Sequence, residues 1–369
     1  MTEPIRNTLP ATGRGGQKVL ATLGAALVMG VALFLSSSPL PPAPAAAADD
    51  PQEKNPAAPP RAVAAALAFL DVLDARQKEK VVFEFASPKK SNWSNLPVTM
   101  VQRNGVRLAD LTKEQRARAM EVVAAVLSKG GYQKVVDIME GDQKLADRGR
   151  GGRGGGNGPM FGADLYYLAI FGKPSETQPW MVQFGGHHLG VNITVIGKHF
   201  VLTPTHTGTQ PALFNRDGKE VRPLGQEADS AFKLVNALDE KQRGQAILAD
   251  RPQQELLLGP GRDGKTIEPK GVKGSALTGA QQALLLELIG AWVNIVEPDT
   301  AAARMAGIKD KIGETYFAWS GPTANGSAAY FRVQGPTVVI EYAPQGGTDH
   351  IHTVIRNPED DYGAAQLKL

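Results

Sequence analysis

Cysteine is absent from all 369 residues of this chain. Its absence excludes a disulfide framework, a thiolate metal site and a lipid anchor on a cysteine that follows an export signal. The core must therefore be stabilised by ordinary burial of apolar side chains. About 310 residues remain after the N-terminal region, enough for one large domain or two closely packed ones.

An excess of charge of one sign is also lacking. The chain has 40 Lys and Arg against 37 Asp and Glu, a formal net charge of +3. The N-terminal region contributes +2 of this (three basic residues minus Glu3), which leaves +1 for the rest. So small a positive net charge does not indicate nucleic-acid binding, and we expect no nucleic-acid partner.

Several catalytic motifs are missing. There is no Gly-x-Ser-x-Gly elbow, no phosphate loop and no His-Glu-x-x-His. Gly149-x-Gly151-x-x-Gly154 matches a dinucleotide fingerprint, but no predicted strand precedes it. We expect the surrounding Gly/Arg-rich stretch, residues 148–158, to be a flexible surface loop and not a nucleic-acid segment.

The N-terminal region has the pattern of an export signal. Three basic residues precede the uncharged apolar run 19–35, and a Pro- and Ala-rich stretch ends at Ala48. The pattern predicts a signal peptide over residues 1–48 and a Pro/Ala-rich tether over 49–60. An uncleaved anchor is the alternative, because about 17 to 25 apolar residues can span a bilayer. In both cases we expect an exported, periplasmic or extracellular protein that touches a membrane at most through this segment.

Capped helices and alternating strands predict a single large α+β domain over residues 61–369. Three segments place Thr or Asp three residues before Gln, the capping-box spacing, ahead of helical apolar patterns. Helices are predicted over 61–74, 113–128, 240–249 and 279–296, and strands over 165–171, 181–184, 189–196, 199–203, 316–319, 329–333, 337–342 and 350–355. We expect amphipathic helices packed on a largely antiparallel sheet, with Asn104-Gly105 and Asp217-Gly218 as hairpin turns.

Two parts of the chain suggest a degenerate internal repeat of a helix followed by strand hairpins. Met181–Gly185 is similar to Phe331–Gly335, and comparable aromatic strands precede both. The repeat halves would span about 93–203 and 278–357. A pseudo-twofold arrangement of these halves would bring their ends to one cleft.

The histidines are confined to two short segments of the chain. The first contains four of the six and the second contains two: His187, His188, His199 and His206, then His350 and His352. Imidazole is the commonest metal ligand and the usual acid or base near neutral pH. This distribution predicts one site built from both segments.

Strand geometry selects the ligand candidates of the second segment. Alternation places His350 and His352 on one face of a strand, where two imidazoles can bind one ion. A hairpin with the preceding strand would place Glu341 beside them. Two histidines and a carboxylate form the arrangement used by non-haem iron and, with water, by catalytic zinc.

In the first segment His188 shares a strand face with Asn192, which occupies the repeat position equivalent to Glu341. His188 is therefore the better ligand candidate. The same alternation places His187 on the apolar face, as a structural residue or a partner of the ligands, unless a bulge at the preceding glycines turns both rings inward.

The remaining candidates have weaker support. We expect His199 at the surface, whereas the sequence leaves His206 undecided. Trp180 and Trp319 could stack on a ring-shaped ligand, although core packing is the more frequent role of tryptophan. Arg356 follows the second histidine segment and could hold an anionic ligand.

A series of short motifs resembles the family catalogued as domain of unknown function 3500. The motifs include Phe171-Gly172-Lys173-Pro174-Ser175, Gly186-His187-His188-Leu189, Trp319-x-Gly321, Ile340-Glu341 and His350-Ile351-His352-Thr353. The likeness begins near Trp93 and covers nearly all of the chain that follows. It implies no particular reaction. It does imply motif positions for His187, His188, Asn192, Glu341, His350, His352 and Arg356, whereas His206 stands where an apolar residue such as Phe is expected and the loop 148–158 looks like an insertion.

These observations predict a metal-dependent enzyme, a hydrolase or an oxidoreductase. The predicted ligands are His188, His350 and His352, with His187 beside them, and the metal is Zn, Fe or Cu. Glu341 would be a fourth ligand or general base, while Asn192 and Arg356 would orient a small-molecule or polymer-derived substrate, anionic or ring-shaped. The alternative is a non-catalytic periplasmic or cell-surface protein that binds such a ligand without turnover.

Overall fold

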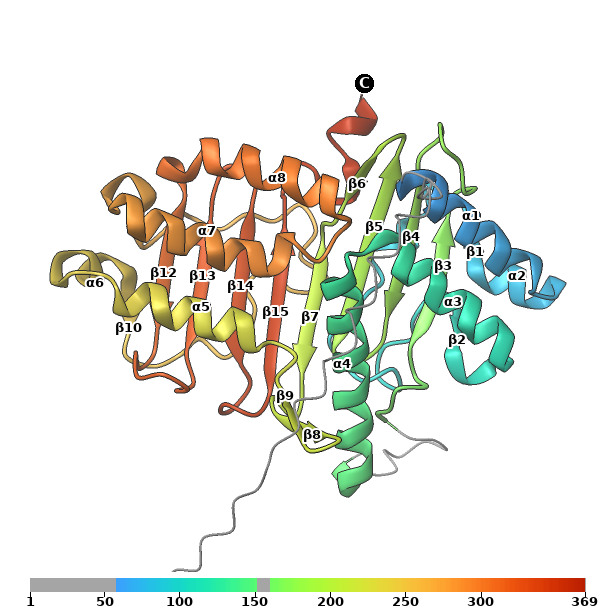
Figure 1. Cartoon of the computed structure of the whole chain (residues 1–369), viewed down its shortest axis with the longest axis horizontal. Coiled ribbons are helices and arrows are strands. Elements are labelled where there is room, and N and C mark those ends of the chain that lie inside the picture. Colours follow the sequence, from blue (N-terminus) through green and yellow to red (C-terminus); the bar gives the residue numbers. More distant parts are fainter. Residues whose placement is uncertain (1–57, 151–159, 369) are drawn as a thin grey trace, which may run out of the picture. The chain divides into compact units, whose positions relative to one another are not determined.

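A mixed sheet of thirteen strands forms the centre of the fold (Figure 1). This computed structural model describes residues 58–150 and 160–368, which belong to one unit spanning residues 54–369. The predicted signal peptide, most of the tether and most of the predicted loop 148–158 lie outside the described residues, and the last tether residues, 58–60, begin α1. Among the described residues, no helix is both long and apolar enough to cross a membrane.

The sheet is antiparallel except at its two edges. Its main path runs through β1 (Val82–Phe83), β3 (Tyr167–Phe171), β4 (Trp180–Gly185), β5 (Leu189–Ile196), β7 (Thr205–Thr209), β15 (Ile351–Arg356), β14 (Val339–Pro344), β13 (Tyr330–Gln334), β12 (Tyr316–Ser320) and β10 (Ile247–Ala249). Three short strands pair beside this path: β2 (Val106–Arg107) with β3, β6 (His199–Val201) with β5, and β11 (Val272–Lys273) with β12. Among the described strands, only β1–β3 and β10–β12 are parallel pairs, and β8 (Phe214–Arg216) with β9 (Lys219–Val221) forms a separate hairpin.

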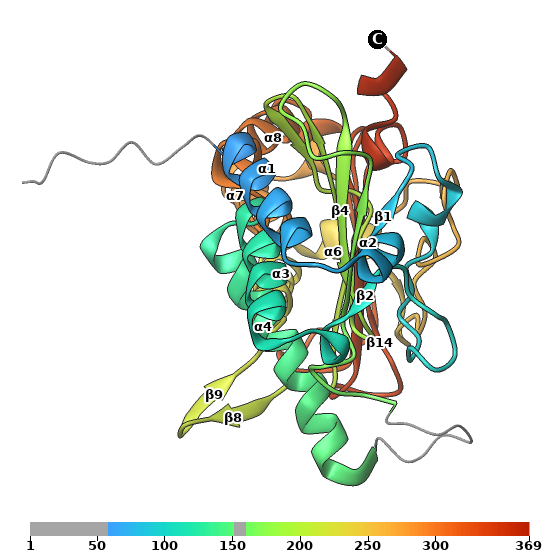
Figure 2. The same cartoon turned by 90° about the vertical axis from the view of Figure 1, so that its right-hand side faces the viewer.

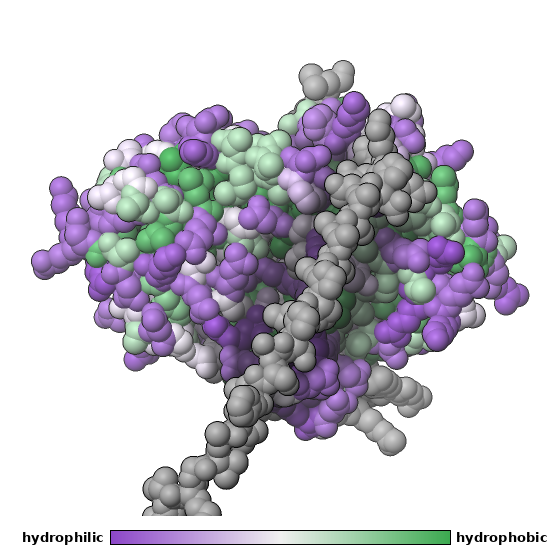
Figure 3. Space-filling model, in the orientation of Figure 1, coloured by the Kyte–Doolittle hydropathy of each residue, from purple (hydrophilic) through white to green (hydrophobic). Residues whose placement is uncertain are grey.

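Helices cover one face of the sheet, and irregular segments cover the other. The described helices are α1 (Ala58–Asp71), α2 (Ala75–Val81), α3 (Lys113–Val126), α4 (Lys129–Leu145), α5 (Gly225–Asn236), α6 (Glu240–Ala246), α7 (Gly279–Val293) and α8 (Pro298–Asp310). Figure 2 shows α1, α3, α4, α7 and α8 on one side of the sheet, with segments 84–105 and 250–271 on the other. The outer, helix-covered side carries mainly hydrophilic side chains interspersed with smaller apolar areas (Figure 3). The α+β class predicted from the sequence is confirmed.

The predicted helix starts are confirmed by their caps. Thr112, Asp239 and Thr278 each accept a hydrogen bond from the backbone of a glutamine three residues later, and that glutamine side chain bonds back to the cap. Helix α4 was not predicted, because its first turn contains Gly130 and Gly131. A Cβ at Gly131 would lie 2.1 Å from the carbonyl oxygen of Ile295, so close packing and not helix propensity requires this glycine.

One of the two predicted turns is correct. Asp217 and Gly218 connect β8 to β9 with positive φ angles of 51° and 79°, as a two-residue hairpin turn requires. Asn104-Gly105 is not a hairpin turn. Gly105, with φ of 92°, leads into β2, and a Cβ there would lie 2.0 Å from the carbonyl oxygen of Leu168, so this glycine serves a close backbone approach.

The strand order is the same on both sides of the central β7–β15 pair. From the edge inward it runs β3, β4, β5 and β7 on one side and β12, β13, β14 and β15 on the other. Because β7 and β15 are neighbours in this order, the end of the first histidine-containing segment, in β7, lies beside the second segment, in β15. The predicted internal repeat itself stays a prediction.

Candidate metal centre

The central strand β7 positions both histidine segments. His187 and His188 lie at the tip of the β4–β5 hairpin, and β7 pairs with β5 on one side and with β15 on the other. Gly208 of β7 donates its N–H to the His188 carbonyl and lies opposite His352. A Cβ at Gly208 would lie 3.1 Å from the Cδ2 atoms of both His188 and His352, so the absence of a side chain there leaves room for both rings.

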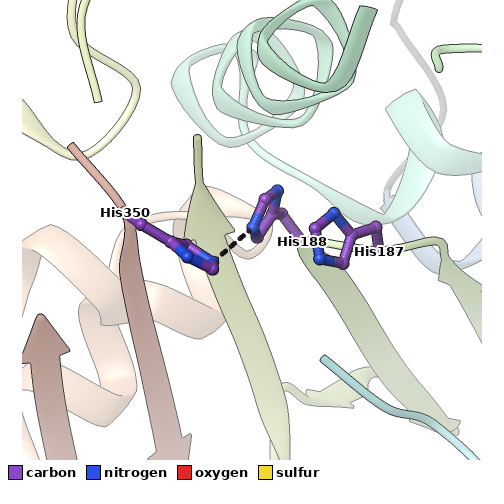
Figure 4. A group of neighbouring side chains, drawn as sticks. All are labelled: His187, His188 and His350. Carbon is purple, nitrogen blue, oxygen red and sulfur yellow. Dashed lines mark hydrogen bonds between the residues drawn. The ribbon is translucent and has the colours of Figure 1, made fainter. Parts of the chain in front are cut away.

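Three imidazoles converge at this end of the sheet. His187, His188 and His350 each offer a ring nitrogen, and these three atoms lie within 4.8 Å of one another (Figure 4). Nε2 of His188 lies 3.0 Å from Nε2 of His350, which in turn lies 3.0 Å from Nε2 of His352. Tetrahedral zinc with Zn–N bonds of about 2.0–2.1 Å separates neighbouring ligand nitrogens by about 3.4 Å. The 3.0 Å separation of the His188 and His350 nitrogens differs from this spacing by a few tenths of an ångström, so small shifts would allow these two rings to bind one ion.

Asp142 of α4 orients His188. Its Oδ1 lies 2.6 Å from Nδ1 of His188, and its Oδ2 accepts a 2.7 Å hydrogen bond from the hydroxyl of Tyr166. Because the carboxylate accepts the proton on Nδ1, Nε2 of His188 presents its lone pair towards His350. A carboxylate behind a histidine is the usual support of a metal-binding imidazole.

Nδ1 of His187 makes a long contact with Asp142 but no hydrogen bond among the described residues. It lies 3.4 Å from Oδ1 of Asp142, and the side chain is only 7% exposed. Its ring packs against Phe161 and His188. A buried nitrogen without a hydrogen bond is costly unless something else binds it, and a metal ion would do so.

Burial in the cluster favours the uncharged form of His187, His350 and His352, and the histidines in turn favour the charged form of Asp142. Burial lowers the pKa of His187 to about 4 and that of His350 to about 3, and it lowers the pKa of His352 well below its ordinary value. Burial by itself would raise the pKa of Asp142, but attraction to His188 and His187 outweighs this effect and lowers it below its usual range. Neutral imidazole is the metal-binding form, so His187, His350 and His352 are in that form near neutral pH.

Two further residues border the cluster. The side-chain amide of Asn95 contacts Nδ1 of His352 at 3.0 Å. His206 is fully buried, donates from Nδ1 to the Thr353 carbonyl at 2.7 Å, and lies 5.4 Å from His352 between ring centroids. Its Nε2 has no hydrogen-bond partner among the described residues. The structure thus places His206, undecided from the sequence, next to the ligand candidates.

Glu341 does not join the histidines. It pairs with Val354, because β14 extends to Pro344 and sets Ala343 opposite His352. The carboxylate of Glu341 accepts hydrogen bonds from the backbone N–H groups of residues 257 and 258 and from the hydroxyl of Tyr330. The sequence led us to expect this carboxylate beside His350 and His352, but the register of β14 against β15 places it opposite Val354 instead. Glu341 holds segment 250–271 on the sheet.

The other two predicted catalytic residues are also engaged elsewhere. Arg356, 1% exposed, donates to the carbonyls of residues 258 and 259 and to the carboxylates of Asp263 and Asp361. Asn192 accepts from Gln183 and donates to the Pro204 carbonyl. Neither side chain hydrogen-bonds to a histidine of the cluster, so both stabilise the fold in this structure.

The predicted ring-stacking tryptophans belong to the core. Trp180 and Trp319 are both 0% exposed and lie in the main hydrophobic cluster, so neither can stack on a ligand at the surface. His199 is exposed at the start of β6, as the sequence predicted.

Sequence reasoning missed Asp142 and Tyr166. A signal for Asp142 was present, because Val135, Ile138, Asp142 and Leu145 recur at helical spacing and place a carboxylate on the buried stripe of α4. An acid on an apolar helix face needs a partner.

The fold and the cluster define an α+β protein with a group of histidines that could hold a metal ion. The chain belongs to the family described as "Protein of unknown function (DUF3500)", whose sequence profile matches residues 56–364. No curated protein and no solved structure matches the chain.

Proposed function

We propose that this protein is a metal-dependent enzyme whose ion is bound by His187, His188 and His350. The observation that carries the proposal is the convergence of three ring nitrogens within 4.8 Å, one of them on a ring held by the buried carboxylate of Asp142. Three protein ligands leave a coordination position for water or substrate, as in catalytic zinc sites. His350 is only partly buried, and this exposure supports access of water or substrate to the ion from the solvent.

The ligand set favours zinc or copper over iron. Imidazole suits zinc and copper, whereas the common non-haem iron site adds a carboxylate to two histidines. Two candidates for that carboxylate are already engaged, Asp142 by His188 and Tyr166, and Glu341 by the 257–258 backbone. We therefore favour a hydrolase, in which bound zinc would lower the pKa of a water molecule, over an oxidoreductase.

In this proposal the residues around the ion have separate roles. Asp142 fixes the proton of His188 on Nδ1, so that Nε2 faces the ion. His352 lies beside His350, with their Nε2 atoms 3.0 Å apart, and the amide of Asn95 fixes the His352 ring through Nδ1. Gly208 keeps the space between the rings open.

Export is part of the proposal and rests on the N-terminal sequence alone. A basic start, an apolar run and a small-residue stretch support a periplasmic or extracellular location. The proposed substrate is a small or polymer-derived molecule that reaches the histidines from outside the cytoplasm.

Metal content tests the site directly. The protein would be purified without a histidine tag, reconstituted with zinc and assayed by elemental analysis, beside His188→Ala, His350→Ala and His199→Ala. We expect one zinc per chain in the wild type and in His199→Ala, since His199 is exposed on β6, and loss of zinc in the other two. A wild type without stoichiometric metal, or a His188→Ala variant with full metal, would contradict the proposal.

Turnover separates the enzyme from a binding protein. Ester, amide and phosphoester substrates would be screened with the zinc-loaded wild type, after chelation and after zinc is restored. We expect hydrolysis that chelation abolishes and zinc restores. Stoichiometric zinc combined with ligand binding but no turnover would instead support the non-catalytic alternative.

A further inference from the structure

A cavity lies on the helix-covered face, next to the first turns of α5. Its volume is about 240 Å³. Its walls come from Leu224 and Phe232 at α5, Ala329 before β13, Tyr342 of β14 and Ile351 of β15. Ile351 adjoins His350 in the chain, but the lining of the cavity contains no histidine. The cavity is therefore separate from the histidine cluster.

A row of stacked aromatic rings supports two walls of this cavity. Tyr342 stacks on Phe331 with ring centroids 4.7 Å apart, Phe331 stacks on Trp319 at 5.9 Å, and Trp319 meets the edge of Phe232 at 5.0 Å. Phe331 and Trp319 are almost completely buried. The walls formed by Tyr342 and Phe232 are thus fixed by the core, and preformed walls are typical of small-molecule sites.

The polar groups at the cavity carry no free charge. The guanidinium of Arg222 binds both carboxylate oxygens of Asp229 at 2.8 Å, which neutralises it. The hydroxyl of Tyr342 makes no hydrogen bond with any described residue, and burial raises the pKa of this phenol, so it stays protonated. Ser327 and Thr348 add two more neutral hydroxyls to the lining, and a space with neutral polar groups and no uncompensated charge selects against charged ligands.

We propose that this cavity binds a neutral molecule with a single ring and one hydroxyl or carbonyl group. The ring would lie between the aromatic and aliphatic walls, and its polar group would exchange a hydrogen bond with Tyr342. The inference goes beyond the proposed metal enzyme and is independent of it, because none of the histidines takes part.

Ligand-observed NMR with p-cresol, toluene and benzoate tests the site on the full-length protein. We expect saturable binding of p-cresol, weaker binding of toluene, and none of benzoate, whose charge would have to be buried. Tyr342→Phe should weaken p-cresol about fivefold, the effect of one hydrogen bond, and leave toluene unchanged. Ala228→Phe, on the cavity side of α5, should abolish binding of both.

Matched controls keep the test specific. Ala64→Phe places the same larger side chain on an exposed position of α1 and should leave all affinities at the wild-type value. Circular dichroism would verify the fold of each variant, and the conservative Tyr342→Phe tests the site if Ala228→Phe does not fold. Absence of p-cresol binding, equal binding of benzoate, or p-cresol affinity unchanged in Tyr342→Phe would overturn the proposal.

Discussion

Asp142 and His188 are joined by a 2.6 Å contact between Oδ1 and Nδ1, and this contact ties helix α4 to the tip of the β4–β5 hairpin. Both side chains are almost completely inaccessible to solvent. The pair orients the His188 ring, which faces His350. A residue of helix α4 therefore fixes the geometry of the histidine cluster at the end of the sheet. Its energetic role can be measured with single substitutions.

Asp142→Asn should weaken zinc binding about 10- to 100-fold, the usual effect of removing a carboxylate that supports a metal-binding histidine. The amide keeps the shape but loses the charge that fixes the Nδ1 proton. Chelator competition would measure the affinity. Asp137→Asn is the matched control, because Asp137 lies on the same helix and pairs with Arg216 instead. Equal zinc affinities in the two variants would show that Asp142 does not support the metal-binding histidine.

Gly208→Ala should disrupt the cluster through its Cβ. The added atom would lie 3.1 Å from two histidine rings and 2.9 Å from the carbonyl oxygen of Ile351, so strands or rings must shift. We expect a loss of about 1–3 kcal/mol in the free energy of unfolding, together with weaker zinc binding. Gly244→Ala serves as the control, since a Cβ there meets nothing within 4 Å, and urea titration would compare the variants.

The metal-free protein should lose stability as the pH falls from about 6.5 towards 4. Folding lowers the pKa of His187 to about 4 and those of His206 and His350 to about 3, from an ordinary value of 6.5. In that pH window the unfolded chain binds protons that the folded chain does not, so acid favours unfolding. Urea unfolding near pH 7 and near pH 5 would measure the difference.

His206→Phe should reduce that pH dependence, because it removes one buried imidazole that titrates only on unfolding. His199→Ala should leave it unchanged, since this side chain is exposed. A wild-type stability that is constant from pH 7 to 5 would show that His187, His206 and His350 do not have lowered pKa values in the folded protein.

Glu341→Gln should affect stability and leave zinc binding intact. The amide cannot accept all the hydrogen bonds from the 257–258 backbone and Tyr330, and we expect a loss of about 1–3 kcal/mol in the free energy of unfolding. Zinc stoichiometry should remain at the wild-type level in elemental analysis. Loss of zinc in a folded Glu341→Gln variant would show that this carboxylate contributes to metal binding.

Local patterns in the sequence determined much of the secondary structure. The capping boxes at Thr112, Asp239 and Thr278 mark real helix starts because their hydrogen bonds join residues three apart, within one turn. Period-two alternation likewise identified strands such as β5 and β15. The confinement of histidine to two segments correctly indicated where one cluster forms.

Only the tertiary structure decided which groups meet. Strand β7, Thr-His-Thr-Gly-Thr, is fully buried but has no apolar residue, so no hydrophobic period revealed the strand that separates His188 from His352. The register of β14 against β15 moved Glu341 away from the histidines, and packing of α4 brought in Asp142. The sequence by itself determined the ligand types and their local faces, because these follow from dihedral preferences and side-chain period. Partners far apart in the chain depend on strand order, register and close packing, which no local pattern encodes.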